Sequence, residues 1–438
     1  MKTNSKNHII KQKIFELIKE YHLNEINDKI PDGNVVIPPS GKLIDQDELI
    51  YMAEAVLDGW LTHGRFNQKF EVELADFLDV KKVLTVNSGS SANLVAFYTL
   101  TSSKLKERAI KKGDEVISVA AGFPTTVNPS IQFGAIPVFV DIDLKTYNIC
   151  AEKIEAAITK KTKAIMLAHT LGNPYNLDII CKICKKYNLW LIEDTCDALG
   201  ATFNGKKVGT FGDIGTLSFY PAHHITMGEG GAVFTNSLKL WRIAQSIRDW
   251  GRDCYCDPGQ DNTCGRRFGW KLGDLPKGYD HKYTYSHLGF NLKITDIQAA
   301  CGLAQLKKLD NFIEIRRENF NFLKTSLEGL DDVISLPEPT KNSNPSWFGF
   351  PITLKEKCQL SRDEVVNALN KKGIGTRLLF AGNLTKQPYM ENVKFKVHDN
   401  LYNTDIIMKN TFWVGLHPSL SREMLNFLSE TIRKLVEK

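Results

Sequence analysis

Hydrophobic residues recur along the chain with two different periods, and each period predicts its own element. Over residues 8–21 apolar side chains return every three or four positions, which is the spacing of one face of an α-helix. The members of this stripe are Ile10, Ile14, Leu17, Ile18 and Tyr21. We expect an amphipathic helix that packs on the body of the protein, within an N-terminal helical extension of residues 1–40. Binding to a membrane surface is the weaker alternative.

From about residue 80 the pattern changes to short β-rich runs separated by helical stretches. Seven such runs occur in the order KVLTV, EVISVA, IPVFVDI, KAIMLAH, LWLIED, GTLSFY and GAVFTN. Strands that alternate with helices form a mainly parallel sheet covered by helices. The sequence therefore predicts an α/β fold for a large domain over residues 41–310.

Two changes of pattern follow the seventh run. Residues 251–280 contain Gly, Asp, Arg, Pro and Cys with almost no periodicity, and a loop of this length inside a domain is typically functional or disordered. A helical stretch then runs from Thr295 to Leu327, after which FGFPITL begins a second series of strand and helix signals. We therefore predict a smaller C-terminal α+β domain over residues 311–438.

Composition narrows the class of protein. The 438 residues are 42% hydrophobic, enough to bury a large core. Lys and Arg outnumber Asp and Glu by only 56 to 50, so the net charge of +6 is spread thinly and does not indicate nucleic-acid binding. The first forty residues contain no continuous apolar run, and no later window reaches the length of a membrane span. We expect a cytoplasmic protein without nucleic-acid or membrane partners, whose nine cysteines are reduced thiols, some of them metal ligands.

Candidate ligand-binding residues follow three of the predicted strands. NSGSSAN, residues 87–93, lies between a strand and a helical run, where free backbone N–H groups hold phosphates, although an ordinary N-cap explains the same residues. Phe123 in AGFPTT is either a core side chain or a platform for a ring. Glu193 and Asp194 end the strand in LWLIED, and a carboxylate at that edge points into the crevice where ligands bind. Their order is more informative than any one of them.

Taken in that order, the motifs resemble the fold-type-I, aspartate-aminotransferase-like pyridoxal-phosphate enzymes, and specifically the DegT-type sugar aminotransferases, from about residue 40 onwards. The resemblance implies a phosphate cradle at Gly89 and Ser90, with a hydroxyl from Ser218. It also implies that Phe123 stacks on the cofactor ring and that Asp194 pairs with the pyridine nitrogen and keeps it protonated.

The segment that should carry the reactive lysine of this family contains no lysine. Aligning SFYPAHHITMGEGG, residues 218–231, with the family pattern SF-x-P-x-K places His223 at the lysine position. An imidazole cannot form a Schiff base with pyridoxal phosphate, which argues against ordinary transamination. A histidine near neutral pKa suits proton transfer. The alternative is a structural histidine in an inactive relative.

This departure resembles the nucleotide-sugar 3-dehydrases. The resemblance implies that pyridoxamine phosphate forms a Schiff base with a sugar ketone, that His223 removes a proton from C4′ of the cofactor, and that the hydroxyl at C3 is expelled. The predicted product is a 3,6-dideoxy sugar for surface polysaccharide, such as the O-antigen of lipopolysaccharide.

Four cysteines have the spacing C-x57-C-x-C-x7-C, with three of them in the irregular loop. Four thiolates can hold an iron–sulfur cluster or, nearly as well, zinc. The spacing resembles that of the dehydrase branch acting on CDP-4-keto-6-deoxyglucose. That resemblance implies a [2Fe–2S] centre and electrons from an NADH-dependent iron–sulfur flavoprotein reductase. The set is Cys196, Cys254, Cys256 and Cys264. The alternatives are a zinc-stabilised sensor or scaffold, and the same chemistry on a TDP-sugar.

The remaining candidates concern partners and substrate. LGFNLKITDIQAACGLAQL resembles the family segment whose asparagine reaches the phosphate of a neighbouring subunit, which implies a homodimer and assigns this role to Asn291. His224 and Arg377 are candidates for substrate contacts, Arg377 as an anchor for a diphosphate or else an ordinary surface arginine. Cys181 and Cys184 form a C-x-x-C that we interpret as a core-facing helix stripe.

Overall fold

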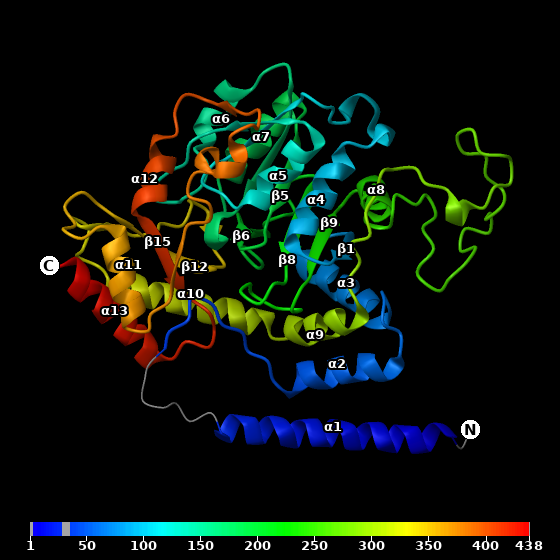
Figure 1. The fold of residues 1–438 in the computed structure, drawn as a ribbon, viewed down its shortest axis with the longest axis horizontal. Helices are drawn as coiled ribbons and strands as arrows, with labels where there is room; N and C mark the ends of the chain where they lie inside the picture. Colours follow the sequence, from blue (N-terminus) through cyan, green and yellow to red (C-terminus); the bar gives the residue numbers. More distant parts are fainter. Residues whose placement is uncertain (1–2, 29–35, 438) are drawn as a thin grey trace.

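The structure is a computed structural model that describes residues 3–28 and 36–437 (Figure 1). Its centre is an eight-stranded sheet in the order β1-β9-β8-β5-β4-β2-β3-β14. The strands are β1 (Lys82–Val86), β2 (Glu115–Ser118), β3 (Ile136–Phe139), β4 (Thr162–Ala168), β5 (Trp190–Asp194), β8 (Ile214–Ser218), β9 (Gly231–Thr235) and β14 (Lys396–Val397). Strand β9 is antiparallel to both neighbours, and the other pairs are parallel. This mixed, mainly parallel sheet confirms the predicted fold class, and each of the seven β-rich runs overlaps one of its strands.

Helices cover both faces of this sheet. The helices are α1 (Thr3–Asp28), α2 (Gln46–Asp58), α3 (Arg65–Leu78), α4 (Gly89–Leu100), α5 (Pro124–Phe133), α6 (Ala151–Ala157), α7 (Leu177–Tyr187), α8 (Leu238–Arg248), α9 (Asp296–Leu306), α10 (Leu309–Ser326), α11 (Arg362–Lys371), α12 (Tyr402–Asn410) and α13 (Arg422–Val436). Successive strand residues point to opposite faces. Val116 of β2 therefore packs with α4 and α8, whereas Ile117 packs with α6 and α7. Burial on both sides explains why the strands read as apolar runs.

The C-terminal part contains a smaller antiparallel sheet in the order β10-β12-β15-β13. Its strands are β10 (Ile334–Ser335), β12 (Gly349–Leu354), β13 (Thr376–Leu378) and β15 (Thr411–Gly415), and a third, short sheet joins β6 (Thr202–Phe203), β7 (Lys206–Lys207) and β11 (Ser343–Asn344). Helices α11, α13 and the end of α10 pack on the smaller sheet through a core of their own. The limits of the three expected segments remain a proposal, since β14 lies in the C-terminal segment and joins the large sheet.

Two predicted helices differ in detail from the observed ones. Helix α1 contains the predicted helix over residues 8–21 but is longer, and its apolar stripe is only half covered: Ile14 and Ile18 are half-buried while the rest of the stripe is exposed. The stretch predicted as one helix from Thr295 to Leu327 is divided into α9 and α10 at Lys308, where φ is −101° and ψ −5°. No helix in residues 3–28 or 36–437 is long and apolar enough to cross a membrane.

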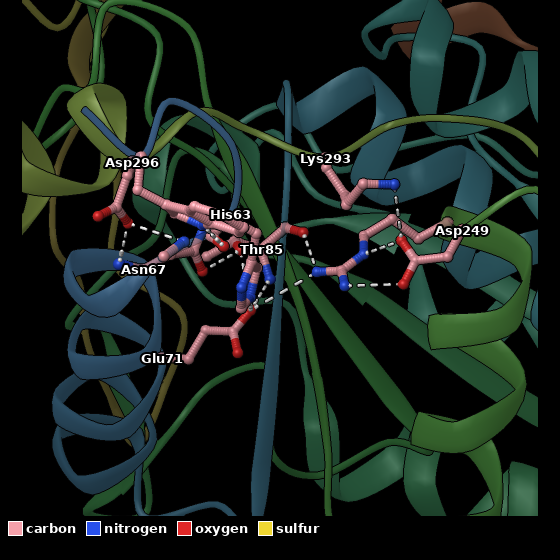
Figure 2. A network of polar contacts seen from close by, with 10 residues as sticks. His63, Asn67, Glu71, Thr85, Asp249, Lys293 and Asp296 are labelled. Carbon is pink, nitrogen blue, oxygen red and sulfur yellow. Dashed lines mark hydrogen bonds and ion pairs between the residues drawn. The ribbon is translucent and has the colours of Figure 1, made fainter. Parts of the chain in front are cut away.

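The irregular segment 251–280 leaves the end of α8 and extends away from the sheet (Figure 1). A polar network anchors its base (Figure 2). Arg248 donates from Nε and Nη2 to the carboxylate of Asp249, at 2.8 and 3.1 Å, and from Nη1 to the carbonyl of Thr85 at 3.1 Å. Lys293 Nζ donates to the same carboxylate at 3.4 Å. The residues just before the segment are therefore tied to β1 and to Lys293, which follows the segment in the sequence.

Candidate active site

A cleft of about 960 Å³ opens at the carboxyl edge of the large sheet. The residues after β5 and β8 and the first turns of α4 and α5 form one side, and the smaller sheet forms the other. Eight of the predicted site residues line the cleft, namely Gly89, Ser90, Phe123, Asp194, Cys196, Ser218, His223 and Arg377. Ligands of α/β proteins bind at this edge because the strand ends and the helix N-termini converge there.

The N-terminus of α4 forms the polar end of the cleft. Ser88 caps the helix, since its Oγ accepts a hydrogen bond from the N–H of Ser91 at 3.0 Å. A Cβ atom at Gly89 would lie 2.4 Å from Cβ of Ser218, so only glycine fits this close approach. The first N–H groups of a helix have no intrahelical partner and attract anions. Together with the hydroxyls of Ser90 and Ser218 they form a cradle that suits a phosphate.

Asp194 is held rigidly in the floor of the cleft. Its Oδ2 accepts hydrogen bonds from Nδ2 of Asn93 and Oγ1 of Thr126, both at 2.7 Å, and its Oδ1 accepts one from the N–H of Cys196 at 3.1 Å. Asn93 Oδ1 in turn accepts from Oγ1 of Thr216 at 2.7 Å. A carboxylate fixed by this many donors is a preorganised partner for a cationic N–H of a ligand.

Phe123 is not a core side chain. It lines the cleft and is 50% exposed, with its ring centroid 6.2 Å from that of Phe380 in an edge-on arrangement. A large aromatic ring that stays exposed within a cleft offers a face for stacking. This exposure favours the ring-platform interpretation of Phe123.

His223 lies in the cleft with a neutral imidazole. Burial lowers its pKa to about 4, an effect that the charge of Asp194 opposes and that of Arg316 reinforces. Its Nδ1 is 3.5 Å from Oδ1 of Asp197 and has no hydrogen-bond partner, and its ring centroid is 5.2 Å from that of Phe348. A neutral imidazole at the wall of a ligand cleft is able to accept a proton.

His224 lies outside the cleft, contrary to its prediction as a substrate contact. The side chain is buried, and its Nε2 is 2.9 Å from the carbonyl oxygen of Ser346, to which it donates. Consecutive residues in this turn point in different directions, since His223 lines the cleft and His224 does not. Arg316 of α10 stabilises the same region, since its guanidinium donates to the carbonyls of Phe348 and His223 at 3.1 and 3.4 Å.

Arg377 lines the cleft of its own chain, whereas Asn291 does not. Arg377 lines the cleft from β13 with an exposed side chain, its Nη1 donating to the carbonyl of Thr376 at 2.9 Å. Asn291 is exposed and does not line the cleft of its own chain, and its Oδ1 accepts from Nζ of Lys293 at 2.9 Å. The role of Asn291 at a neighbouring subunit stays a prediction.

The structure separates the four predicted metal ligands. Cys196 lines the large cleft, whereas Cys254, Cys256 and Cys264 line a small pocket within the loop. In the part of the chain that the structure describes, no three His, Cys, Asp or Glu side chains are arranged to hold a metal ion. The predicted set of four ligands is therefore not gathered at one site within the chain: three line one pocket and the fourth lines another. Four cysteines in one sequence need not meet when a segment anchored elsewhere carries three of them.

The C-x-x-C of α7 is part of the core, as interpreted from its spacing. Cys184 is buried and Cys181 packs against the same apolar cluster. Burial raises the pKa of Cys181 to about 12 and raises that of Cys184 further. Both thiols therefore stay protonated at neutral pH, as is typical of core side chains.

Sequence reasoning missed several residues that support the site. Asn93 and Thr126 fix Asp194, Arg316 fixes the backbone of His223, and Asp197 faces the imidazole. A usable signal existed for Asp197, which follows Asp194 by three residues at the same strand end. No signal pointed to Arg316, which comes from a helix distant in sequence.

The residues of the cleft fit pyridoxamine phosphate. The glycine cradle has room for a phosphate and none for a side chain. Asp194 supplies a fixed carboxylate, and Phe123 offers an open aromatic face. This donor set matches an anionic phosphate, a cationic pyridine N–H and a flat ring.

Comparisons with known proteins agree with this geometry. Residues 42–433 match the model of the DegT/DnrJ/EryC1/StrS aminotransferase family. The chain is 62% identical over 420 residues to the lipopolysaccharide biosynthesis protein RfbH of Salmonella typhimurium, with 96% of each chain covered. It is 50% identical over 428 residues to the dTDP-4-dehydro-2,6-dideoxy-D-glucose 3-dehydratase of Saccharopolyspora spinosa, with 98% of this chain and 92% of the relative covered.

A solved structure of a sugar dehydratase has the same fold. A mutant of GDP-4-keto-6-deoxymannose-3-dehydratase with bound GDP-perosamine matches with a TM-score of 0.82 and 31% identity, over 90% of this chain and 100% of that one. Another structure of that dehydratase, with a TM-score of 0.81, 31% identity and the same coverage, contains a trapped PLP–glutamate geminal diamine.

Proposed function

The chain belongs to the DegT/DnrJ/EryC1/StrS aminotransferase family, and from this premise we propose that it removes the C3 hydroxyl of a nucleotide-linked 4-keto-6-deoxyhexose, with pyridoxamine phosphate as cofactor. One observation carries the proposal. Among the described residues that line the cleft there is the imidazole of His223 and no lysine. A cleft without a lysine amine cannot hold the cofactor covalently or pass its amino group through the protein, but it can still transfer protons.

Each residue then has a defined task. When bound, the cofactor supplies an amine that condenses with the sugar ketone and a ring that accepts electrons. Gly89 and the first turn of α4 hold the phosphate, Asp194 holds the ring N–H, and Phe123 stacks on the ring. His223, neutral because its pKa is lowered by burial, takes the proton at C4′. Its pKa of about 4 makes it a weak base that depends on close positioning.

The net reaction requires a reductant. Replacing C3–OH by C3–H releases water and consumes an electron pair and two protons. We propose a separate NADH-dependent iron–sulfur flavoprotein reductase as the donor. The competing donor is glutamate, because the solved GDP-sugar dehydratase holds a PLP–glutamate adduct. One chain does not bring its four predicted cysteine ligands together, so no electron path through a [2Fe–2S] cluster follows from the single chain.

The substrate and the assembly complete the proposal. The sequence resemblance favours a CDP-4-keto-6-deoxyhexose, with Arg377 at the diphosphate, whereas two relatives are named for dTDP- and GDP-sugars. The product would serve 3,6-dideoxysugar synthesis for surface polysaccharide, which the similarity to a lipopolysaccharide biosynthesis protein supports. Asn291, exposed outside its own cleft, suits a homodimer in which it serves the neighbouring cleft.

The test is a substrate and donor matrix. Protein loaded with pyridoxamine phosphate is incubated with CDP-, dTDP- and GDP-4-keto-6-deoxyhexoses, each with glutamate or with NADH and a reductase. Mass spectrometry follows the loss of the C3 oxygen. We expect deoxygenation of the CDP-sugar with the reductase. Amination at C4 without loss of the C3 oxygen would contradict the proposed reaction, and turnover of a dTDP- or GDP-sugar alone would correct the nucleotide.

A further inference from the structure

The ring of Phe123 has one aromatic neighbour that can fix its orientation. The backbone of Phe123 is held in place, because this residue is the N-cap of α5 and precedes Pro124, which restricts its conformation. The side chain, however, is 50% exposed in the cleft. Within residues 3–28 and 36–437, the one aromatic ring in contact with it is that of Phe380, with 6.2 Å between centroids and 82° between planes. Phe380 is therefore the residue best placed to orient Phe123.

Phe380 has a backbone conformation that is unfavourable for its side chain. It is the second residue of a turn in which the N–H of Gly382 donates to the carbonyl of Leu379 at 2.9 Å, and its φ is +48°. This left-handed region favours glycine, and a bulky residue stays there only where the surrounding structure holds it. Glycine would form the same turn without strain, so the aromatic ring that lines the cleft is the feature that requires explanation.

Hydrogen bonds tie this turn to the segment that immediately precedes Phe123. The N–H of Ala381 donates to the carbonyl of Gly122 at 3.3 Å, and the N–H of Leu384 donates to that of Ala120 at 2.9 Å. These bonds fix the backbones that carry the two rings relative to each other, although the two segments are far apart in the sequence.

The turn is also supported from behind. Asn383 is 1% exposed, and its Nδ2 donates to Oδ1 of Asp405 at 2.8 Å. Its Oδ1 accepts from the N–H and the Oγ1 of Thr385 at 3.0 and 2.7 Å. Leu384 is buried in an apolar cluster that includes Val127 of α5. The turn therefore forms a rigid support beside the ring of Phe123.

The orientation of Phe123 matters because the cleft offers no covalent attachment. Among the described residues that line it there is no lysine, so a bound cofactor is positioned by non-covalent contacts alone. The phosphate cradle and Asp194 fix two points of the cofactor and leave it free to rotate about the line that joins them. A ring stacked on Phe123 removes this rotation, which would change the distance between C4′ and His223.

We infer that Phe380 is a positioning residue of the cofactor site, which holds the ring of Phe123 in the orientation that stacks on pyridoxamine phosphate. The inference rests on the proposed function, because it takes Phe123 to be the stacking ring. Phe380 acts through Phe123 and not by touching the cofactor. The free energy of an edge-on aromatic pair corresponds to a change in affinity of about two- to tenfold.

A double-mutant cycle on the affinity for pyridoxamine phosphate tests the inference. The variants are Phe123→Leu, Phe380→Leu and the double replacement. Titration calorimetry gives the affinity, and the circular dichroism of the bound cofactor reports the orientation of its ring. We expect Phe380→Leu to weaken binding about two- to tenfold and to change the circular dichroism. It should have no further effect once Phe123 is replaced, because the two residues act as one unit.

Two further variants separate this effect from a general loss of stability. Phe380→Gly suits the left-handed backbone and removes the ring, so it should weaken binding as Phe380→Leu does, with a urea midpoint no lower than that of Phe380→Leu. Phe395→Leu is the matched control, because it removes another half-buried ring of the same segment, which pairs with Phe139 and does not line the cleft. This control should bind with the affinity of the wild type.

The possible failures are distinguishable. Additive losses in the double variant would overturn the inference, because Phe380 would then act on the cofactor directly. An equal loss in Phe395→Leu would overturn it as well, since the effect would be one of stability. Unchanged binding in Phe380→Leu beside a clear loss in Phe123→Leu would overturn the inference and leave the proposed function intact. Unchanged binding in Phe123→Leu would remove the stacking role from the proposed function and the inference with it, and a wild type that does not bind pyridoxamine phosphate would overturn both.

Discussion

The cofactor cleft and the loop 251–280 position their reactive groups in different ways. In the cleft, Asp194 ends a buried strand and accepts three hydrogen bonds, and Gly89 starts a helix against Ser218. In the loop, three cysteines lie on irregular backbone tied to the body mainly at its base, and the nearby Phe268 is 62% exposed. One site is determined by the fold of a single chain, and the other is left incomplete by it.

The difference shows where rigidity is needed. Proton transfer requires a base within hydrogen-bond reach of the reacting atom, so the cleft is built from strand ends and buried donors. A surface loop tolerates exposed backbone and is free to contact another molecule. Changes in the cleft should therefore alter chemistry and stability strongly, whereas changes in the loop should alter assembly with little effect on folding.

The largest expected effect is that of His223→Asn. The variant keeps a side chain of similar polarity in the cleft but loses the base, so we expect proton exchange at C4′ of the cofactor to fall by about 10²–10⁴. Affinity for pyridoxamine phosphate should change little, because His223 is not part of the phosphate cradle or the ring N–H contact. Tritium exchange at C4′ measures the step without a reductase.

His224→Asn is the matched control. His224 donates to the backbone of Ser346 away from the cleft, so its replacement should lower stability more than exchange. A larger loss of exchange in His224→Asn than in His223→Asn would show that His224 is the base, and it would contradict the assignment of this role to His223.

The next effect is the response of the cleft to acid. The unfolded imidazole of His223 titrates near 6.5 and the folded one near 4, so between these values the unfolded state binds more protons. The free energy of unfolding therefore falls as the pH is lowered from 6.5 to 4. At about 1.4 kcal/mol per pKa unit, the contribution of His223 is roughly 3 kcal/mol. Asp194 opposes and Arg316 reinforces the shift.

Urea unfolding at several pH values checks this contribution. His417, whose pKa burial also lowers to about 4, is present in both the wild type and His223→Asn and cancels in their difference. The variant should lose less stability than the wild type over this pH range. If the free energy of unfolding depends on pH in the same way in both proteins, His223 is as solvated in the folded state as in the unfolded state.

A smaller effect is expected at the phosphate cradle. Gly89→Ala places a methyl group 2.4 Å from Cβ of Ser218, and such overpacking costs about 1–3 kcal/mol. If Ser218 moves to relieve it, affinity for pyridoxamine phosphate should fall, roughly tenfold for each 1.4 kcal/mol lost. Gly122→Ala, whose new Cβ would meet only Val119 at 3.5 Å, is the control. Equal affinities for both variants, measured by titration, would place the phosphate elsewhere.

The sequence predicted the cleft better than the loop for a physical reason. Asp194 ends a buried strand, and a carboxylate at that edge of an α/β sheet is expected to point into the ligand crevice. The family resemblance assigned the role of Ser218, which ends β8 at the same edge. The direction of each histidine in the turn after β8 was not predictable, because Ser346 and Arg316, which determine it, come from distant segments. The hydrogen bonds that join Asn93 to Asp194 and Thr216 were not predictable for the same reason, because they connect segments that are distant in the sequence.

The loop was predictable only as a loop. Its lack of periodicity identified it as a loop. The spacing of its cysteines identified a candidate ligand set, but spacing along the sequence does not show where each cysteine lies in the folded chain. Asp253 and Lys104, which tie the loop to the far end of α4, are separated by 149 residues. Where a loop is anchored by such contacts, a metal site cannot be assembled from sequence spacing alone.

The smallest effects come from a matched pair of polar deletions, one in each region. Asn93→Ala removes a buried amide that joins Asp194 to Thr216, and it leaves their oxygens short of partners. Such a loss costs about 1–3 kcal/mol. Asp261→Asn removes an exposed carboxylate that pairs with Lys282 and Arg267 in the loop. Exposed pairs contribute little because water and salt screen them. We therefore expect a clear drop in the urea midpoint for Asn93→Ala and no resolvable change for Asp261→Asn. Equal drops in the two variants would mean that the loop is as much a part of the cooperative fold as the cleft, and the contrast between the two regions would not hold.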